Sequence, residues 1–438
     1  MNIAVAGTGY VGLVTGTCLA HVGHNVTCVD IDEAKVKLME SGVSPIYEQD
    51  LEGLMKENYA AGRIHYTTDY ASAYKNAEVI FIGVGTPELP DGSCNLSYVM
   101  TVAEQIAGSV EQDVIVVVKS TVPIGTNDKI EKFLNEKKAH NVKIMVASNP
   151  EFLSQGTAVR DTLHASRIVF GTECKEAEEV MYKVYENFSG VPIVSVNRRS
   201  AEMIKYASND FLALKISYMN DLANFCELVG ADVKAVAKGM SFDERIGGRF
   251  LNPGIGFGGS CFPKDTKALK SLAKDLGYDF KTVAAAIDVN EKQQIRLYTK
   301  AKAAGIDFNG KKVAMVGLAF KAGTDDLREA ASLKNVPLLL ADGADIVAYD
   351  PVAQRNFENR YPAGKYDNGS ISYAISAREA LKGADVCFVM TEWEECRELK
   401  ASDFVEFMTK PIVFDGRNIY DPSEMKKAGV EYYCIGRP

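Results

Sequence analysis

Residues 2–12 read NIAVAGTGYVG, and this stretch decides the fold of the first part of the chain. Its first half is mostly apolar and predicts a short buried strand. A turn follows with the spacing Gly-x-Gly-x-x-Gly, formed by Gly7, Gly9 and Gly12. The small and apolar residues beyond the turn predict a helix that continues to about Val22. Such glycines permit a tight turn, close approach of a ligand to the backbone, and packing of the helix on the strand.

The strand predicted after this helix, residues 25–29, ends at Asp30. A carboxylate at this place accepts hydrogen bonds from the ribose hydroxyls of a dinucleotide, while the helix N-terminus faces the pyrophosphate. The same carboxylate repels a 2′-phosphate, so the sequence favours NAD over NADP. Lys35 weakens that preference, since it is close enough to reach the same region.

Further apolar runs predict more strands of this domain at 79–84, 114–119 and 144–148, each followed by a cluster of Gly, Pro or Asn. Apolar residues then recur at steps of three and four over 200–230, with no Pro or Gly before the end of that span. This periodicity predicts a long helix that joins two domains and whose apolar face is wide enough for a subunit contact.

The pattern of the first residues returns near the end of the chain. Strands are predicted at 312–316, 345–349, 386–390 and 411–414, with a turn at 317–321 after the first of them. The turn lacks the Gly-x-Gly-x-x-Gly spacing. This second βαβ-type domain is therefore expected to bind something other than a dinucleotide pyrophosphate at its strand ends.

These patterns predict an α/β fold with two Rossmann-like doubly wound domains joined by a central long helix within a helical dimerisation region. The expected domains are an N-terminal NAD-binding domain over 1–198, a central dimerisation and active-site domain over 199–300, and a C-terminal nucleotide-binding domain over 301–438.

Composition excludes some other classes of protein. The 438 residues carry a net charge of −9, which argues against a nucleic-acid partner. No apolar run reaches the roughly 18 residues of a membrane span. The nine cysteines are odd in number and scattered, with no Cys-x-x-Cys, which indicates reduced thiols and a cytoplasmic protein. Cys28 and Cys387 lie in apolar runs and are expected to be small buried side chains.

Cys261 has different neighbours. Residues 256–265 read GFGGSCFPKD, which places the thiol in a glycine-rich bend shortly before Lys264 and Asp265. A thiol needs a nearby positive charge or base to act as a nucleophile. A nucleotide cofactor together with such a thiol suggests an oxidation that passes through a thioester; the alternative is a packed turn with an inert thiol.

Other polar residues follow predicted strands or share a helix face. Thr86 and Thr121 stand at strand ends, where they either face the cofactor or simply end the strand. Glu151 follows another strand and either orients a water or is a surface acid. Lys205 and Asn209 are four residues apart on the long helix, where they either stabilise an oxyanion or form a solvated face.

Three basic residues could meet an anionic substrate. Arg245 lies in a glycine-containing segment and is either a substrate contact or an ordinary surface charge. Lys321 and Arg328 flank the turn of the second nucleotide-binding domain, and both suit the charge of a diphosphate. The five histidines form no metal pattern, so no metal is expected.

Together these motifs closely resemble the UDP-glucose 6-dehydrogenase family of nucleotide-sugar dehydrogenases, over essentially the whole chain. The matching motifs are GTGYVG at 7–12, GVGTP at 83–87, STVP at 120–123, NPEFL at 149–153, the Lys205/Asn209 helix, FLNPG at 250–254 and the block 256–265. The resemblance implies oxidation of the C6 alcohol of UDP-glucose to the carboxylate with two NAD, in a homodimer formed through the central helix.

The resemblance also assigns roles. Cys261 resembles the nucleophile, Lys205 and Asn209 the oxyanion-stabilising pair, and Asp265 the base of a water-activating set with Thr121 and Glu151. The residues that match NAD contacts are Gly7, Gly9, Tyr10, Val11, Gly12, Asp30, Lys35, Thr86, Thr121, Glu151, Lys264 and Arg328. Those that match substrate contacts are Glu151, Phe152, Leu153, Lys205, Asn209, Phe250, Leu251, Asn252, Pro253, Gly254, Gly258, Lys321 and, for the neighbouring subunit's substrate, Arg245.

The chain departs from the family pattern at one place. Many relatives carry a second acid four residues after the glutamate of the Asn-Pro-Glu-Phe motif, where this chain has Gln155. Glutamine keeps the hydrogen bonding and loses the charge, so Glu151 becomes the better candidate for proton relay.

Two other readings compete. One is a related dehydrogenase that acts on GDP-mannose or a UDP-N-acetylhexosamine. The other is a non-catalytic nucleotide-sensing protein with the same fold. The presence of Cys261, Lys205 and Asp265 argues against it, since sensing alone needs none of them.

Overall fold

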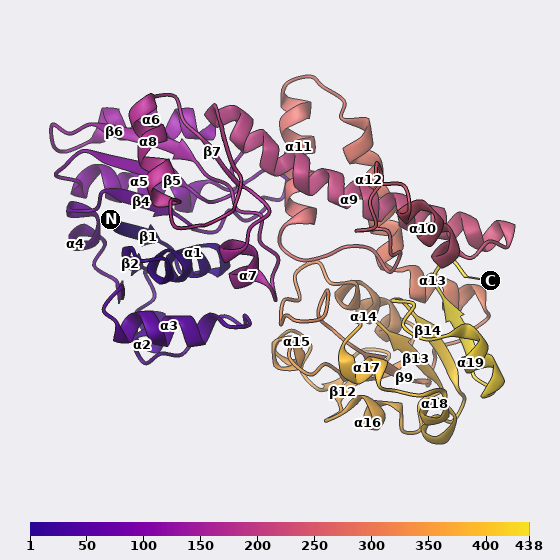
Figure 1. Ribbon diagram of the computed structural model, residues 1–438. Helices are drawn as coiled ribbons and strands as arrows, with labels where there is room; N and C mark the ends of the chain where they lie inside the picture. The colour runs from indigo at the N-terminus through magenta and orange to yellow at the C-terminus, as the bar shows by residue number, and fades with distance from the viewer. Residues whose placement is uncertain (438) are drawn as a thin grey trace. The chain divides into compact units, whose positions relative to one another are not determined.

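The structure is a computed structural model that describes residues 1–437 (Figure 1). The chain divides into two compact units, residues 1–208 and residues 209–438. Each contains one sheet, and the long helix α9, Arg198–Val229, passes from the first unit into the second.

In residues 1–208 the strands form one sheet in the order β3-β2-β1-β4-β5-β6-β7-β8, parallel except between β6 and β7. The strands are β1 Asn2–Ala6, β2 Asn25–Val29, β3 Ile64–Thr67, β4 Val79–Ile82, β5 Val114–Val118, β6 Ile144–Ser148, β7 Ile168–Gly171 and β8 Ile193–Val196. The order reverses between β1 and β4, which is where dinucleotides bind in such sheets.

Helices cover both faces of this sheet (Figure 1). They are α1 Tyr10–His21, α2 Glu33–Glu40, α3 Leu51–Ala60, α4 Tyr70–Lys75, α5 Ser97–Ser109, α6 Thr126–Lys137, α7 Ala158–Leu163 and α8 Lys175–Val184. Every residue of β4 and β5 is buried, as expected for parallel strands covered on both sides. In β1, Ile3 and Val5 join one core, and Ala4 and Ala6 join the core on the opposite face.

Two charged side chains near the start of α9 attach it to the first unit. Glu202 accepts hydrogen bonds from the backbone N–H of Gly125 (2.5 Å) and Asn127 (2.9 Å), at the N-terminus of α6. An anion is favoured there because those N–H groups have no partner within their own helix. Arg198 is buried and pairs with Asp128 and Glu131. The chain thereby fixes the part of α9 that carries Lys205.

The second unit repeats the Rossmann strand order with an added antiparallel edge strand, β11-β12-β10-β9-β13-β14-β15. Its strands are β9 Lys312–Val316, β10 Asp345–Tyr349, β11 Gly364–Lys365, β12 Ser370–Tyr373, β13 Val386–Val389, β14 Ile412–Asp415 and β15 Glu431–Cys434. The helices are α10 Val233–Ser241, α11 Phe262–Asp275, α12 Lys281–Gln294, α13 Arg296–Ala303, α14 Ala331–Ala341, α15 Gln354–Arg360, α16 Ala377–Leu381, α17 Glu394–Arg397, α18 Ala401–Phe407 and α19 Pro422–Lys427.

The two-sheet α/β fold and the long helix are confirmed, and each predicted strand lies within one or two residues of an observed one. Cys28 and Cys387 are buried as expected. Among residues 1–437, no helix is long and apolar enough to cross a membrane.

Candidate active site

The first glycine turn has the geometry that a dinucleotide needs. Gly7 has a φ of +92°, and a Cβ on Gly12 would lie 2.0 Å from the carbonyl oxygen of Gly7. These two positions therefore require glycine for the turn and for helix packing. A Cβ on Gly9 would meet no atom within 4 Å, so the backbone is open there, directly before α1 begins at Tyr10. This opening fits a pyrophosphate at the helix N-terminus.

Asp30 follows β2 and is tied to the same turn. One carboxylate oxygen accepts hydrogen bonds from the N–H (3.1 Å) and the hydroxyl of Thr8, and Lys35 lies 3.7 Å from that oxygen. Burial raises the pKa of Asp30, but these hydrogen bonds, one from the Asp32 N–H and the charge of Lys35 together hold it below its ordinary value. An ionised acceptor is therefore available for ribose hydroxyls, and the residues present fit NAD.

The loops after β4 and β5 meet through Thr86, whose hydroxyl donates to the carbonyl oxygen of Thr121 (3.0 Å). The structure thus brings together two residues that the sequence placed at separate strand ends. This contact fixes the Thr121 backbone beside the carboxyl edge of the sheet, where ligands bind in such folds.

Glu151, in the loop after β6, forms a buried ion pair with Lys205 of α9, with 2.9 Å between Oε1 and Nζ. Its other oxygen accepts from the N–H of Leu153 (2.9 Å). The ring of Phe152 lies 3.7 Å from the Arg167 guanidinium and 5.5 Å from Lys205 Nζ. A carboxylate and an ammonium group held this close away from water are poised to exchange a proton or to orient one.

Lys119, at the end of β5, is a residue to which the sequence analysis gave no role. Its ammonium group donates to Asn149 Oδ1 (3.0 Å). Burial, together with the positive charge of Lys205, lowers the pKa of Lys119 to about 8, although Glu151 opposes the shift. Only the fold brings these side chains together, because they come from separate strand ends.

Cys261 is the N-cap residue of α11 and is half-buried. Its carbonyl accepts from the N–H of Asp265 (2.8 Å), which closes the first turn of the helix. Its Sγ lies 3.8 Å from the Ser260 hydroxyl. A helix N-terminus stabilises a negative charge, and the thiolate is the form of a cysteine that attacks carbonyl groups.

The carboxylate of Asp265 is buried one helical turn beyond the thiol. Its Oδ2 accepts from Asn209 Nδ2 (2.6 Å) and its Oδ1 from Lys264 Nζ (2.6 Å). Asn209 and Lys205 share one face of α9, as the sequence predicted, since they lie four residues apart on one helix. Lys264 matches a position that the family resemblance assigns to NAD binding. In the structure its ammonium group donates to Asp265, the candidate base.

Asp210, next to Asn209, was missed by sequence reasoning. It is 6% exposed, and neither carboxylate oxygen has a hydrogen-bond partner among residues 1–437. Burial, and then the charge of Asp265, raise the pKa of Asp210 to about 8. The protein therefore holds this side chain as a neutral acid at neutral pH.

The raised pKa of Asp210 predicts a pH-dependent stability. An aspartate in the unfolded chain titrates at about pH 4. Between that pH and about 8 the unfolded state loses its proton while folded Asp210 keeps it, so the wild-type protein should lose stability as pH rises through this range. Asp210→Asn cannot ionise, and its thermal-unfolding midpoint should rise relative to wild type between about pH 5 and pH 8 and level off above. Asp221→Asn, at an exposed site of the same helix, is the control. A constant difference across this range would contradict the prediction.

The segment before the thiol carries the predicted substrate contacts. Phe250 has a φ of +64°, and its ring lies 6.4 Å from that of Phe262. The N–H of Gly254 donates to the Asn220 side chain (2.8 Å), and a Cβ on Gly254 would lie 3.0 Å from the Gly416 carbonyl oxygen. Backbone strain and close packing thus hold this loop in one conformation.

The three basic residues expected to meet the substrate or cofactor differ in setting. Lys321 lies 5.6 Å from the centre of the Phe320 ring. Arg328 binds Asp326 while its side chain stays 60% exposed, so its charge is accessible to an anion. The exposed Arg245 binds Asp243. Sequence reasoning missed Arg417, whose guanidinium donates to the carbonyl oxygens of Phe320 and Met390 (both 2.8 Å) and so fixes the same turn.

The glycine turn of the second sheet is filled by the chain itself. Asp350 Oδ2 accepts from the N–H groups of Leu318 (2.6 Å) and Ala319 (3.0 Å) and from the indole of Trp393 (2.9 Å). A Cβ on Gly317 would lie 2.5 Å from Thr391. The N–H groups that would bind a pyrophosphate are therefore already used, in agreement with the missing glycine spacing.

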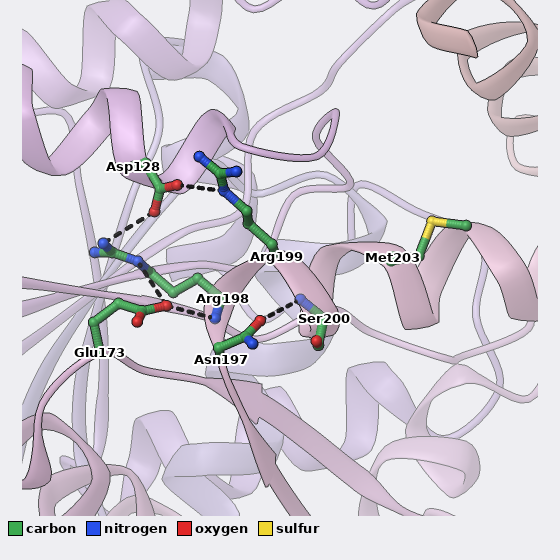
Figure 2. A pocket seen from close by; sticks show the side chains of 7 residues that line it. All are labelled: Asp128, Glu173, Asn197, Arg198, Arg199, Ser200 and Met203. Atoms are coloured by element: carbon green, nitrogen blue, oxygen red, sulfur yellow. Dashed lines mark hydrogen bonds and ion pairs between the residues drawn. The ribbon is translucent and has the colours of Figure 1, made fainter. Parts of the chain in front are cut away.

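A separate hollow of about 590 Å³ lies around the start of α9 (Figure 2). Its lining residues are Asp128, Glu173, Asn197, Arg198, Arg199, Ser200 and Met203. Arg198 and Arg199 both bind Asp128, at 3.0 and 2.8 Å, and Arg198 also approaches Glu173. Because these carboxylates neutralise both guanidinium groups, the hollow offers no net positive charge to an anionic ligand.

The glycine turn and Asp30 are typical of NAD-dependent oxidoreductases, and the second sheet repeats the Rossmann strand order of the first. The chain matches the UDP-glucose/GDP-mannose dehydrogenase family in three parts: its NAD binding domain over residues 1–189, its central domain over 199–292 and its UDP binding domain over 314–422. It belongs to this family, and the expected NAD cofactor is confirmed.

Named relatives agree with this membership. The chain is 47% identical to the UDP-glucose 6-dehydrogenase YwqF and 42% identical to TuaD, both of Bacillus subtilis, covering all of this chain and 98% and 93% of theirs. Among solved structures, a UDP-glucose dehydrogenase from Pyrobaculum islandicum is 32% identical with a TM-score of 0.91, covering 100% of this chain and 98% of that one. The UDP-D-ManNAc dehydrogenase of Pyrococcus horikoshii is 28% identical with a TM-score of 0.88, covering 100% and 99%.

Proposed function

We propose that the chain oxidises the C6 alcohol of UDP-glucose to the carboxylate of UDP-glucuronate through a thioester on Cys261. The observation that carries this proposal is the thiol at the N-terminus of α11 with the buried Asp265 one turn later, bound by Asn209. An alcohol dehydrogenase that stops at the aldehyde needs no such thiol. A covalent intermediate holds the reactive carbonyl until oxidation is complete.

The proposed residue roles follow the chemistry. The glycine turn and Asp30 would hold NAD, which would supply the hydride acceptor for each of the two oxidations. Glu151 takes the alcohol proton, directly or through water held near Thr121, while Lys205 balances its charge. The Cys261 thiolate then adds to the aldehyde carbon, and the resulting thiohemiacetal becomes a thioester when C6 loses a second hydride.

Hydrolysis completes the reaction. Asp265 removes a proton from a water molecule while the water oxygen attacks the thioester carbon. The C–S bond then breaks, and Cys261 leaves as a thiolate. Lys205 and Asn209 are suited to stabilise the oxyanion, since both present hydrogen-bond donors on one face of α9. The loop of residues 250–254, with Gly258 and Lys321, binds the UDP-sugar.

A panel of nucleotide sugars tests the substrate. Purified protein with NAD should form two NADH per UDP-glucose consumed and yield the sugar acid. GDP-mannose and UDP-N-acetylmannosamine should react at least about 100-fold less efficiently, because an added or misplaced polar group leaves pocket groups unpaired. Turnover of UDP-N-acetylmannosamine alone would contradict the substrate, and one NADH with free aldehyde would contradict the thioester.

We further propose that the chain is a homodimer formed through α9, within a central domain of residues 199–300 in a three-domain chain of 1–198, 199–300 and 301–438. Ala213, Met219 and Ala223 of α9 are buried in the chain's own unit. Exposed aromatic residues recur every seven positions on this helix; they are Phe211, Tyr218 and Phe225, which are 62%, 56% and 58% exposed. Such an apolar face is typical of a subunit contact.

Phe225→Glu tests the dimer. The wild-type protein should have a mass near twice 47.7 kDa by light scattering, and the variant should approach the monomer mass because a charge would be buried at the contact. Leu276→Glu, which changes another exposed apolar residue outside α9, should leave the mass unchanged. A monomeric wild-type protein would rule out the proposed dimer.

The thiol mechanism also favours a reducing compartment. A catalytic Cys261 must stay reduced between turnovers, and the odd, scattered set of nine cysteines suits that condition. We therefore place the enzyme in the cytoplasm.

A further inference from the structure

Helix α12 presents buried side-chain amides to the chain segment that leads to Cys261. Asn290, Gln293 and Gln294 are 5%, 1% and 4% exposed. Buried amides are costly unless their donors and acceptors are matched. Here the partners are backbone groups of the loop of residues 250–254, which carries predicted substrate contacts, and of the glycine-rich bend.

Asn290 holds Phe257 at two points. Its Oδ1 accepts from the Phe257 N–H (2.7 Å), and its Nδ2 donates to the Phe257 carbonyl oxygen (3.0 Å). The preceding Gly256 has a φ of +80°, and a Cβ there would lie 2.7 Å from Asn290 Oδ1. This side chain thus replaces the backbone partner that a strand would supply, at a position four residues before the thiol.

Gln294 joins the bend to the segment that directly precedes α14. Its Nε2 donates to the carbonyl oxygens of Phe257 (3.1 Å) and Glu329 (2.8 Å). The two segments also touch directly. The N–H of Gly259 donates to the Arg328 carbonyl oxygen (2.7 Å). A Cβ on Gly258 would lie 2.4 Å from the Glu329 carbonyl oxygen. One amide therefore bridges the thiol-bearing segment and the segment that carries Arg328.

Gln293 extends the same arrangement to the substrate loop. Its Nε2 donates to the Gly254 carbonyl oxygen (2.6 Å), while Asn220 accepts from the Gly254 N–H (2.8 Å). A further amide, Asn335, donates to the Gln294 carbonyl oxygen (2.8 Å). Gly254, Phe257 and Glu329 are thus each held by α12 through backbone groups.

We propose that Asn290 and Gln294 are positioning residues that fix the segment leading to Cys261 against Arg328 and Glu329, in the part of the chain that matches the UDP binding domain. Glycines at 256, 258 and 259 leave the bend with little conformational preference of its own. The amide bonds remove that freedom and leave the thiol at one distance from a sugar whose nucleotide is bound nearby. This inference rests on the proposed role of Cys261 as nucleophile.

The test uses near-isosteric variants of the full chain. In Asn290→Leu and Gln294→Met, kcat for UDP-glucose should fall about 100-fold, because a small misplacement of reacting groups costs that much. In Asn290→Leu the KM for NAD should change less than about twofold, since Asn290 bonds Phe257, which is not among the expected NAD contacts. The matched control is Asn58→Leu, a fully buried amide that donates to the Leu54 carbonyl oxygen (2.8 Å). It should lower the thermal-unfolding midpoint and leave kcat per folded molecule unchanged.

Amide hydrogen exchange tests the contact between Asn290 and Phe257 independently of enzyme activity. The Phe257 amide should exchange at least about tenfold faster in Asn290→Leu than in the wild type, because its acceptor is gone. Unchanged exchange would overturn the contact, and faster exchange with unchanged kcat would overturn its role in positioning. If wild type fails to oxidise UDP-glucose, the proposed function fails, while exchange still tests the contact.

Discussion

Cys261→Ala should abolish formation of the sugar acid, with a loss of at least about 1,000-fold. Without sulfur, the aldehyde cannot be held as a thiohemiacetal. The second oxidation, which removes a hydride from that intermediate, therefore cannot take place, and no thioester forms. Any remaining NADH should not exceed one per sugar. The measurement is sugar acid by chromatography together with NADH by absorbance.

The position of the thiol makes this effect specific. Cys261 and Cys174 are both N-cap residues, of α11 and α8, but Cys261 is half-buried one turn before the buried Asp265, whereas Cys174 is exposed. Cys174→Ala should therefore retain wild-type activity. Carboxylate production by Cys261→Ala at the wild-type rate would remove the thiol from the mechanism.

Asp265→Asn should slow turnover by about 10²- to 10⁴-fold and leave the thioester on the enzyme. The asparagine keeps oxygen for a hydrogen bond but cannot take a proton from the attacking water. Both oxidations precede hydrolysis, so a rapid burst of two NADH per thiol should appear before the slow phase. Mass spectrometry should find the sugar attached to Cys261.

The same helix offers a matched control for Asp265. Asp275 is an exposed aspartate at the other end of α11, and Asp275→Asn should behave as wild type. A steady state without a burst, or a burst of one NADH, would show that Asp265 acts before the thioester and not in its hydrolysis.

The sheet centres were predictable, whereas their edges were not. Strands such as β5 are buried on both faces and read as unbroken apolar runs. The outer strands β3 and β8 are partly exposed, mix polar with apolar residues and gave no usable signal. Their register depends on the neighbouring strand and not on their own composition.

The candidate site divides in the same way. Motif spacing proposed Cys261, Asp265, Glu151 and the Lys205/Asn209 pair as candidates, because reactive groups beside glycines or at strand ends are visible locally. Asp210 was missed, since an aspartate on a helix normally faces water and only packing shows that this one is buried with no hydrogen-bond partner in the described residues 1–437.

By itself, the sequence determined the kind of fold and the NAD turn and singled out Cys261 as the candidate thiol, because each depends on a few residues close together in the chain. The tertiary structure decided which polar groups pair: Glu151 with Lys205, Asn209 with Asp265, and Asn290 with Phe257. These pairs join residues 33 to 56 positions apart. Burial makes each such contact obligatory, and burial is a property of the folded chain alone.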